Sequence, residues 1–179
     1  ILARSTEMEV VEVEDEPSVE PNRLYVIPPN RSMGIAGGVL SLLPRPEGGM
    51  QHRPVDQFFS ALAEDRGHRA IGVVLSGTGS DGTRGVQAIK AQGGITFAQD
   101  ATAQQDSMPR SAIASGCVDF VLAPRDIAEE IVRIAHHPFI GVAEGAPPEE
   151  TRRGTSLERI FGVLRQATGV DFTHYKFNT

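Results

Sequence analysis

The fold is decided by the stretch Ala70-Ile71-Gly72-Val73-Val74-Leu75-Ser76-Gly77-Thr78-Gly79-Ser80-Asp81-Gly82. An apolar run of strand length stops abruptly in a loop of glycine and hydroxyl residues, and a helical pattern over 86–91 follows. Turns of this kind, between a strand and a helix of an α/β sheet, hold ligands and catalytic groups. The loop is therefore the first candidate for a functional site.

The segments on both sides of this stretch predict a doubly wound α/β fold. Pro54 opens a helical pattern that Gly67 is placed to cap, just before the strand at 70–75. Such alternation of helix and strand is typical of a mainly parallel, Rossmann-like sheet with helices on both faces. The later elements are a helix up to Gly93-Gly94, a strand at 95–98, a helix at 109–114, a strand at 118–122 and an amphipathic helix at 124–135.

Further strands are predicted upstream: residues 8–14 alternate between apolar and acidic residues, and the run at 23–27 is stopped by Pro28-Pro29. Gly37-Gly38 separates the apolar runs 33–36 and 39–43. This spacing predicts a β-hairpin added to the sheet.

Three parts are predicted along the chain: an α/β domain at 1–140, a linker at 141–154 and a helical segment at 155–179. The linker is rich in Gly, Ala, Pro and Glu, as is typical of exposed connecting segments. The last segment is too short to bury a core of its own, so we interpret it as the start of a second domain. The opening residues Ile1-Leu2-Ala3-Arg4 resemble the end of a helix, which predicts further sequence upstream.

Composition excludes several classes of function. The chain has 179 residues and a formal net charge of −6, without the basic excess of nucleic-acid-binding proteins. Cys117 is the only cysteine, so we expect neither an internal disulfide nor a cysteine-based zinc cluster, and predict a small core residue there. No apolar run is long enough to cross a bilayer and no signal-peptide pattern is found, so we expect a cytoplasmic protein without membrane insertion.

The glycine loop has two interpretations. Gly77-Thr78-Gly79-Ser80-Asp81-Gly82 fits the G-x-G-x-x-G pattern of dinucleotide-binding turns, and Asp100 ends the next strand, where an acid would bind a ribose. Asp81 would face the pyrophosphate, however, and like charges in a partly desolvated site repel. A helix N-terminus attracts an anion that Asp81 itself can supply, so the favoured interpretation is a loop that holds its own carboxylate.

Asp81 then has two possible roles. Held by backbone N–H groups, it would suit the third position of a Ser-His-Asp arrangement, where an aspartate orients a histidine during acyl transfer. The simpler alternative is a cap for the helix that follows the loop. The residue pattern leaves both roles open.

Four stretches in the same order resemble the bacterial chemotaxis protein-glutamate methylesterase family. Residues 157–176 are similar to the start of the chemoreceptor methyltransferase family, so together the resemblances imply a piece of a fused methylesterase–methyltransferase protein. The four stretches are Ala70 to Gly85, the run Leu24-Tyr25-Val26-Ile27-Pro28-Pro29-Asn30, the run Arg53-Pro54-Val55-Asp56-Gln57-Phe58-Phe59, and the run Ser107-Met108-Pro109-Arg110-Ser111-Ala112-Ile113-Ala114.

The resemblance implies a function in chemosensory signal transduction. The family hydrolyses glutamyl γ-methyl esters on the cytoplasmic helices of methylated chemoreceptors, deamidates some glutamines, and uses a Ser-His-Asp triad without a metal or an organic cofactor. The family's aspartate falls at Asp81. A methyltransferase domain of the same chain is a further implied partner. The candidate substrate and oxyanion region comprises Gly77, Thr78, Gly79, Ser80, Met108 and Pro109. For Met108-Pro109-Arg110 the alternative to lining a substrate channel is a helix start with Met108 packed beneath it, and both stay open.

The sequence also departs from the family pattern. The G-x-S-x-G-G turn that carries the family's serine does not occur here, and neither does the family's histidine. Both are expected upstream of Ile1, so residues 1–179 alone are expected to be inactive. Thr78 stands where the main family has methionine and Ser80 where it has asparagine, which bears on substrate fit or oxyanion placement. No receiver domain is found in these residues, so the sequence does not indicate control by a phosphorelay.

Other hydroxyl and imidazole groups are not expected to replace the triad. Ser76, Thr78 and Ser80 are predicted to hydrogen-bond the backbone, because no base is near them in the sequence. The histidines are predicted to be ordinary surface residues, and the adjacent pair among them would diverge on a helix rather than bind a metal. They are His52, His68, His136, His137 and His174.

We therefore predict the methylesterase domain of a receptor-modifying protein. One alternative is a catalytically silent regulatory module that positions a methyltransferase domain, which inactivity of a longer form of the protein would indicate. The other is a dinucleotide-binding oxidoreductase domain, which NAD(P) binding that depends on Asp100 would indicate.

Overall fold

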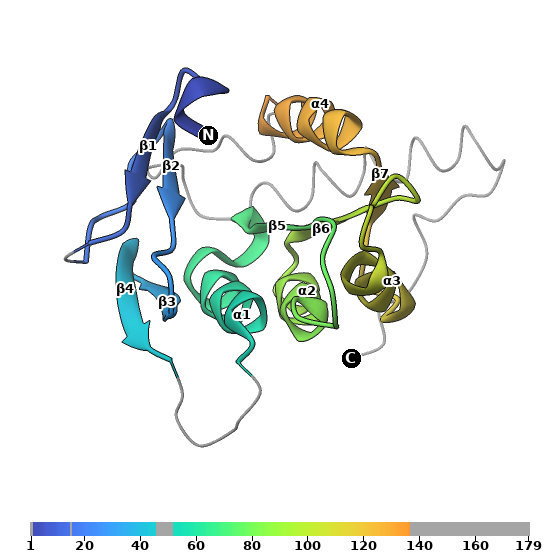
Figure 1. Ribbon diagram of the computed structural model, residues 1–179, viewed down its shortest axis with the longest axis horizontal. Helices are drawn as coiled ribbons and strands as arrows, with labels where there is room; N and C mark the ends of the chain where they lie inside the picture. Colours follow the sequence, from blue (N-terminus) through green and yellow to red (C-terminus); the bar gives the residue numbers. More distant parts are fainter. Residues whose placement is uncertain (1, 15, 46–51, 137–179) are drawn as a thin grey trace, which may run out of the picture. The chain divides into compact units, whose positions relative to one another are not determined.

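The computed structural model describes residues 2–14, 16–45 and 52–136, and the predicted linker and C-terminal segment lie outside them. No helix in these ranges is long and apolar enough to cross a membrane. In chain order the elements are η1 (Leu2–Arg4), β1 (Glu9–Glu12), β2 (Arg23–Val26), β3 (Arg31–Ala36), β4 (Val39–Pro44), α1 (Pro54–Arg66), η2 (Gly67–Arg69), β5 (Ile71–Val74), α2 (Thr83–Ala91), β6 (Ile95–Gln99), α3 (Ser107–Ala114), β7 (Phe120–Leu122) and α4 (Pro124–Ala135) (Figure 1).

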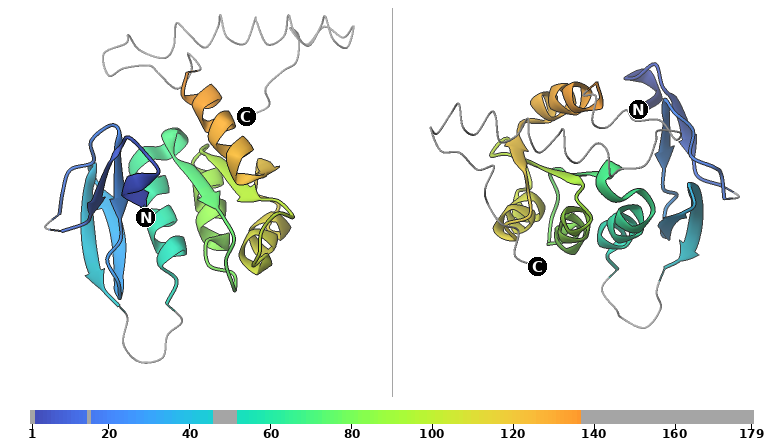
Figure 2. Two further views of the ribbon diagram at one scale, coloured as in Figure 1. Left: turned by 45° about the horizontal axis from the view of Figure 1, so that its top comes forward. Right: turned by 180° about the vertical axis from the view of Figure 1, so that it is seen from behind.

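A parallel sheet with helices on both faces carries the glycine loop. Strands β5, β6 and β7 pair in sequence order, with Val73 opposite Phe97 and Ala98 opposite Val121. Helices α1, α2 and α3 lie side by side on one face of the sheet, and α4 lies on the other (Figure 1 and Figure 2). The predicted doubly wound, mainly parallel α/β fold is confirmed.

The predicted hairpin is confirmed as β3 and β4, an antiparallel pair in which Ala36 lies opposite Val39. Gly37 (φ 57°) and Gly38 (φ 76°) form its two-residue turn, where positive φ values match the twist of the strands. Strands β1 and β2 form a separate parallel pair. The hairpin packs on α1 through a cluster that includes Met33, Ile35, Leu40, Phe58 and Leu62.

Strand β7 is shorter than the predicted strand at 118–122, because the residues before it are tied to the beginning of β6. The N–H of Thr96 donates to the Asp119 carboxylate (3.0 Å), and Thr96 Oγ1 donates to the Cys117 carbonyl (2.6 Å). Cys117 is half-buried and packs against the core cluster around Val74, in agreement with its predicted role as a small packing residue.

Helices α1 and α2 approach each other closely near their N-termini. Gly85 is buried in α2, and a Cβ atom added there would lie 2.5 Å from the Cβ of Phe59 on α1. Gly82, just before α2, has Val55 of α1 as its neighbour: an added Cβ would lie 3.1 Å from the Val55 Cγ1. The glycines of the loop and of α2 thus allow the first turns of the two helices to lie side by side.

We expect Gly85→Ala to lower the free energy of unfolding by roughly 1–3 kcal/mol, because the new methyl group forces α1 and α2 apart. This is opposite in sign to the gain of about 1 kcal/mol that Gly→Ala gives within an unobstructed helix. Urea denaturation measures the difference. Gln87→Ala, on the exposed face of the same helix, is the matched control and should change the free energy by less than about 0.5 kcal/mol. A stabilised Gly85→Ala variant would show that the helices are not in contact there.

Asp119 should make the fold sensitive to acid. Burial raises the pKa of the Asp119 carboxyl, but hydrogen bonds from the Lys90 ammonium and from Thr96 outweigh it and hold the pKa below the ordinary value of 3.8. A lowered pKa in the folded state stabilises the fold above the unfolded-state pKa, and this stabilisation is lost as the pH falls through the folded-state value.

We therefore expect Asp119→Asn to be less stable than the original chain at neutral pH, with a difference that shrinks below about pH 4. Urea denaturation at several pH values measures it. Glu129→Gln removes an exposed ion pair with Arg125 instead, and should change stability little at any of these pH values. An Asp119→Asn difference that is independent of pH would contradict this assignment.

Candidate active site

The glycine loop runs from the end of β5 to the start of α2. Ser76, Thr78 and Gly79 are exposed, whereas Asp81 is half-buried at the far end of the loop. Gly79 (φ 90°) and Gly82 (φ 92°) have backbone conformations that side-chain-bearing residues rarely adopt. The loop therefore needs glycine at both positions to turn Asp81 toward α1.

Three backbone N–H groups hold the Asp81 carboxylate. Val55 N donates to Oδ2 (3.1 Å), while Asp56 N (2.8 Å) and Gly82 N (2.9 Å) donate to Oδ1. Val55 and Asp56 are in the first turn of α1, where N–H groups have no acceptor within the helix. The residue before α1, Arg53, makes no side-chain cap. The structure thus gives Asp81 a capping role, toward α1 and not toward the helix that follows the loop.

The carboxylate of Asp81 also keeps acceptor capacity for another donor. An ionised carboxylate has about four lone-pair sites, and the backbone N–H groups use three of them. The remaining site is on Oδ2. Asp81 is half-buried, so part of the residue remains open to a further donor.

Asp56, in the first turn of α1, binds a backbone N–H of α2 in the same way. Asp56 is only 7% exposed, and its carboxylate accepts the N–H of Gly85 through Oδ1 (2.9 Å) and pairs with Arg53 Nη1 through Oδ2 (3.2 Å). Sequence reasoning missed this role, because an aspartate in a first helical turn is ordinarily explained by the dipole of its own helix.

The segment 105–111 supports the exposed half of the loop. Gly77 N donates to the Gln105 carbonyl (2.8 Å), Met108 N donates to the Gly77 carbonyl (3.0 Å), and Gly79 N donates to Ser107 Oγ (2.9 Å). Met108 covers Gly77 so closely that an added Cβ would lie 2.3 Å from its sulfur. The predicted site residues on these two segments are therefore brought together.

Pro109 is placed differently from the other predicted site residues. It is fully buried in the first turns of α3, whereas Met108 beside it is half-buried. Pro109 therefore supports the loop from the interior and has no surface to offer a substrate.

The hydroxyl groups of the loop differ in their bonding. Ser76 Oγ accepts from Gln105 N (2.9 Å) and lies 3.3 Å from the Gln105 carbonyl, so the prediction that it bonds the backbone is confirmed. For Thr78 and Ser80 that prediction is wrong, because within the described part of the chain neither side chain makes a hydrogen bond. Ser107 takes the acceptor role instead. The N–H groups of Thr78 and Ser80 are likewise without a hydrogen bond among the described residues.

The geometry does not support a dinucleotide site. A pyrophosphate would bind at the N-terminus of α2, the helix that the glycine loop opens, but the Gly85 N–H in the first turn of α2 is taken by Asp56. The Gly82 N–H just before α2 is taken by Asp81. Asp100 is engaged locally: Thr102 donates to its carboxylate from N (3.0 Å) and Oγ1 (2.6 Å), and these bonds lower the pKa of the Asp100 carboxyl. The chain's own carboxylates thus occupy the places of the expected anion.

The described histidines do not contact Asp81. His52 Nε2 lies 3.0 Å from Ser32 Oγ, but Ser32 is only 1% exposed and cannot reach a substrate. His136 Nδ1 lies 2.7 Å from the Val132 carbonyl of its own helix. His137 and His174 lie outside the described residues. Among residues 2–14, 16–45 and 52–136, no group of three His, Cys, Asp or Glu side chains could hold a metal ion.

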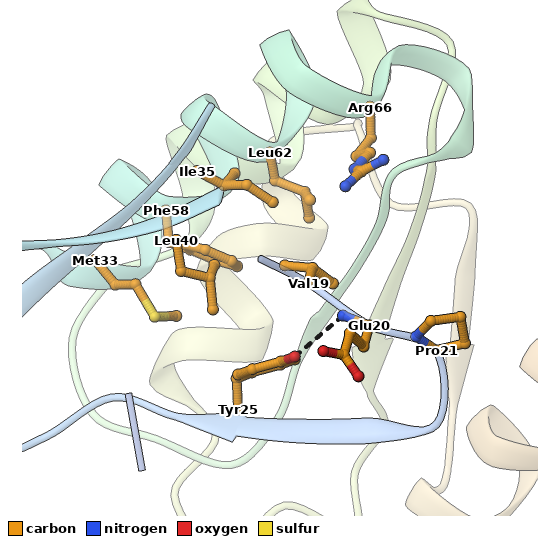
Figure 3. A pocket seen from close by; sticks show the side chains of 10 residues that line it. All are labelled: Val19, Glu20, Pro21, Tyr25, Met33, Ile35, Leu40, Phe58, Leu62 and Arg66. Carbon is orange, nitrogen blue, oxygen red and sulfur yellow. Dashed lines mark hydrogen bonds between the residues drawn. The ribbon is translucent and has the colours of Figure 1, made fainter. Parts of the chain in front are cut away.

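A separate pocket of about 440 Å³ lies between the hairpin, the segment 19–25 and α1 (Figure 3). Apolar side chains, among them Met33, Leu40 and Phe58, line it, and Arg66 points into it. Arg66 ends the helix that Asp81 caps at its beginning. None of the predicted site residues lines this pocket, so it is distinct from the glycine loop.

Comparisons with known proteins match most of the chain. The model of the CheB methylesterase family matches residues 1–131. The structure superimposes on the crystal structure of the Thermotoga maritima CheB methylesterase catalytic domain with a TM-score of 0.67. The two chains are 31% identical, and the match covers 74% of this chain and 73% of that one.

Curated relatives extend the comparison. A putative protein-glutamate methylesterase/protein-glutamine glutaminase of Leptospira interrogans is 35% identical, over 75% of this chain and 70% of the relative. The corresponding protein of Pyrococcus abyssi is 36% identical, over 72% and 36%. An uncharacterized 104.1 kDa protein of Rhodobacter capsulatus is 42% identical, over 96% of this chain and 18% of the relative. The chain thus spans from under a fifth to about a third of the length of several relatives that it matches.

We expect Asp81→Ala to lower the free energy of unfolding by roughly 1–3 kcal/mol, because α1 loses its cap and two of its N–H groups lose their acceptor. Asp100→Ala is the matched control, since the Asp100 carboxylate also accepts a backbone N–H in a loop after a strand, but among the described residues its hydrogen bonds come from Thr102 alone. Asp100→Ala should lower the free energy of unfolding clearly less than Asp81→Ala does. Chemical denaturation of both variants makes the comparison, and equal losses would show that the contacts of Asp81 with α1 add nothing.

Proposed function

Since this chain belongs to the CheB methylesterase family, we propose that it contributes to hydrolysis of glutamyl γ-methyl esters on methylated chemoreceptors, with glutamine deamidation as a second reaction. The relatives named protein-glutamate methylesterase/protein-glutamine glutaminase support both reactions. The observation that carries the proposal is the Asp81 carboxylate, held by three N–H groups with one acceptor site left. The reaction takes place in the cytoplasm, where the receptor helices are.

The proposed mechanism is acyl transfer through a serine and a histidine that precede Ile1 in a longer form of the protein. The serine oxygen attacks the ester carbonyl while the histidine takes its proton, and the histidine then returns the proton to the departing methanol. Water, activated by the same histidine, attacks the acyl-enzyme and releases the glutamate side chain and the serine. No metal or organic cofactor takes part.

Asp81 orients the histidine in this mechanism. Its Oδ2 would accept the Nδ1–H of the imidazole, which fixes the tautomer and stabilises the imidazolium that forms in the transition state. The N–H groups from α1 keep the carboxylate from turning away, so little rearrangement is needed during the reaction.

The exposed half of the loop offers donors for the oxyanion. Thr78 and Ser80 have N–H groups that donate no hydrogen bond within the described ranges, and Gly79 between them is open to solvent. A tetrahedral intermediate needs such donors at about 2.7–3.1 Å from its oxygen. Met108, packed over Gly77, would form the neighbouring wall for the substrate.

We further propose that the chain is part of a multidomain protein. The match to the 104.1 kDa relative covers 96% of this chain, so it continues past the residues that the CheB methylesterase family model matches. A methyltransferase-type domain beginning at 155–179 would be the partner in the same chain. A catalytically silent module that positions this domain is the alternative outcome of the experiment below.

The test is methanol release from methylated chemoreceptor fragments, comparing residues 1–179 with a longer form that extends upstream of Ile1. We expect activity only in the longer form, and a loss of about 10⁴-fold in kcat with Asp81→Asn. Asp100→Asn, the matched control, should keep the activity. If the longer form releases no methanol, the hydrolase proposal fails for these substrates and the silent module becomes the better account.

A further inference from the structure

We propose that Asp56 is a positioning residue for Asp81: its side chain fixes the start of α2 against the first turn of α1 and thereby keeps the Asp81 carboxylate in place. Asp56 contacts Asp81 through its own backbone N–H (2.8 Å) and contacts α2 through its carboxylate. The catalytic consequence rests on the proposed function, whereas the structural part does not.

The contacts of Asp56 close a short ring of hydrogen bonds. Asp56 N donates to Asp81 Oδ1, and Gly85 N donates back to Asp56 Oδ1 (2.9 Å). The chain from Asp81 to Gly85 completes the ring. Each of the two helices thus has a first-turn N–H bound by a carboxylate from the other segment, so a shift of α2 along α1 would break bonds at both ends.

No other described side chain offers Gly85 the same support. The N-cap of α2 is Gly82, which has no side chain, and the adjacent Thr83 Oγ1 is buried without a hydrogen bond among the described residues. The Gly85 N–H is itself buried, so losing its acceptor costs about 1–3 kcal/mol. Arg53 Nη1 binds the second oxygen of Asp56 (3.2 Å) and so fixes the orientation of the carboxylate.

The close packing of the helices makes the contact possible. Gly85 lies so near Phe59 that a Cβ atom has no room, which brings the backbone of α2 within reach of the short Asp56 side chain. A glutamate at position 56 would be one methylene too long for this gap. The geometry thus requires both the small residue on α2 and the short acid on α1.

Loss of the Asp56 carboxylate should therefore loosen Asp81. Gly85 would be left with an unbonded N–H, and the turn from Gly82 to Gly85 would shift to satisfy it. Asp81 directly precedes Gly82, so it would shift with this turn. A displacement of about 1 Å in a catalytic group can cost about 10²-fold in rate. Substrate binding by the exposed half of the loop should change little.

The structural test is amide hydrogen exchange of residues 1–179, read at Val55, position 56 and Gly82. Asp56→Ala should speed exchange at these three amides at least about 10-fold. In Asp56→Asn the side-chain oxygen can still accept from Gly85, so exchange should stay close to the rate of the unsubstituted chain. The Asn variant also covers the case in which Asp56→Ala fails to fold.

Asp65→Ala is the matched control for this experiment. Asp65 is also an aspartate of α1 whose side chain has little exposure. It accepts one backbone N–H from Gly38 (3.2 Å) and pairs with the adjacent Arg66 (2.9 Å), but at the other end of the helix. It should leave the three amides protected. Unchanged protection in Asp56→Ala, or the same loss in Asp65→Ala, would overturn the proposal.

The catalytic test uses the longer form of the protein. We expect Asp56→Ala to lower kcat about 10- to 100-fold with little change in KM, Asp56→Asn to recover most of it, and Asp65→Ala to leave both constants unchanged. A purely structural role would lower the amount of folded enzyme in Asp56→Ala and leave kcat per folded enzyme unchanged, so kcat is expressed per folded enzyme. If the unsubstituted longer form is inactive, the proposed function fails, while the exchange experiment still decides the role of Asp56.

Discussion

The first turns of α1 and α2 each bind a carboxylate from the other segment. Asp81, from the loop before α2, caps α1, and Asp56, from α1, accepts the Gly85 N–H of α2. The N–H groups at the start of a helix need acceptors, and here neither helix obtains one from its own N-cap side chain. The loop between β5 and α2 is therefore fixed by what the two helices require. A group that could orient a histidine is placed by the same bonds that complete the fold.

The two carboxylates that cap α1 and α2 explain why the loop resembles a dinucleotide-binding turn although it holds a carboxylate of the chain itself. Both kinds of loop need glycines so that the backbone can turn sharply and approach its neighbours. Here Gly77 lies under Met108, Gly79 and Gly82 have positive φ values, and Gly82 also lies against Val55. The anion at the helix N-terminus is the chain's own carboxylate, so the pattern of glycines is shared while the ligand is not.

Much of the fold could be predicted from the sequence, because its signals are local. The helix from Pro54 to Arg66 with Gly67 as its cap, the Gly37-Gly38 turn and the order of strands and helices all follow from short-range patterns. The shortening of β7 could not be predicted, since it depends on contacts of Asp119 with Thr96 across two strands. For the same reason the sequence could not place Pro109 in the interior or reveal Asp56, whose partner Gly85 is 29 residues away.

The most direct measurement is a crystal structure of the longer form that extends upstream of Ile1. If Asp81 is the orienting group of a triad, a histidine nitrogen lies within about 2.6–3.2 Å of Asp81 Oδ2, and the N–H groups of Val55, Asp56 and Gly82 still bind the carboxylate. A structure in which these three bonds persist and Oδ2 faces solvent or a group other than histidine would contradict that role. Asp81 would then be only the cap of α1.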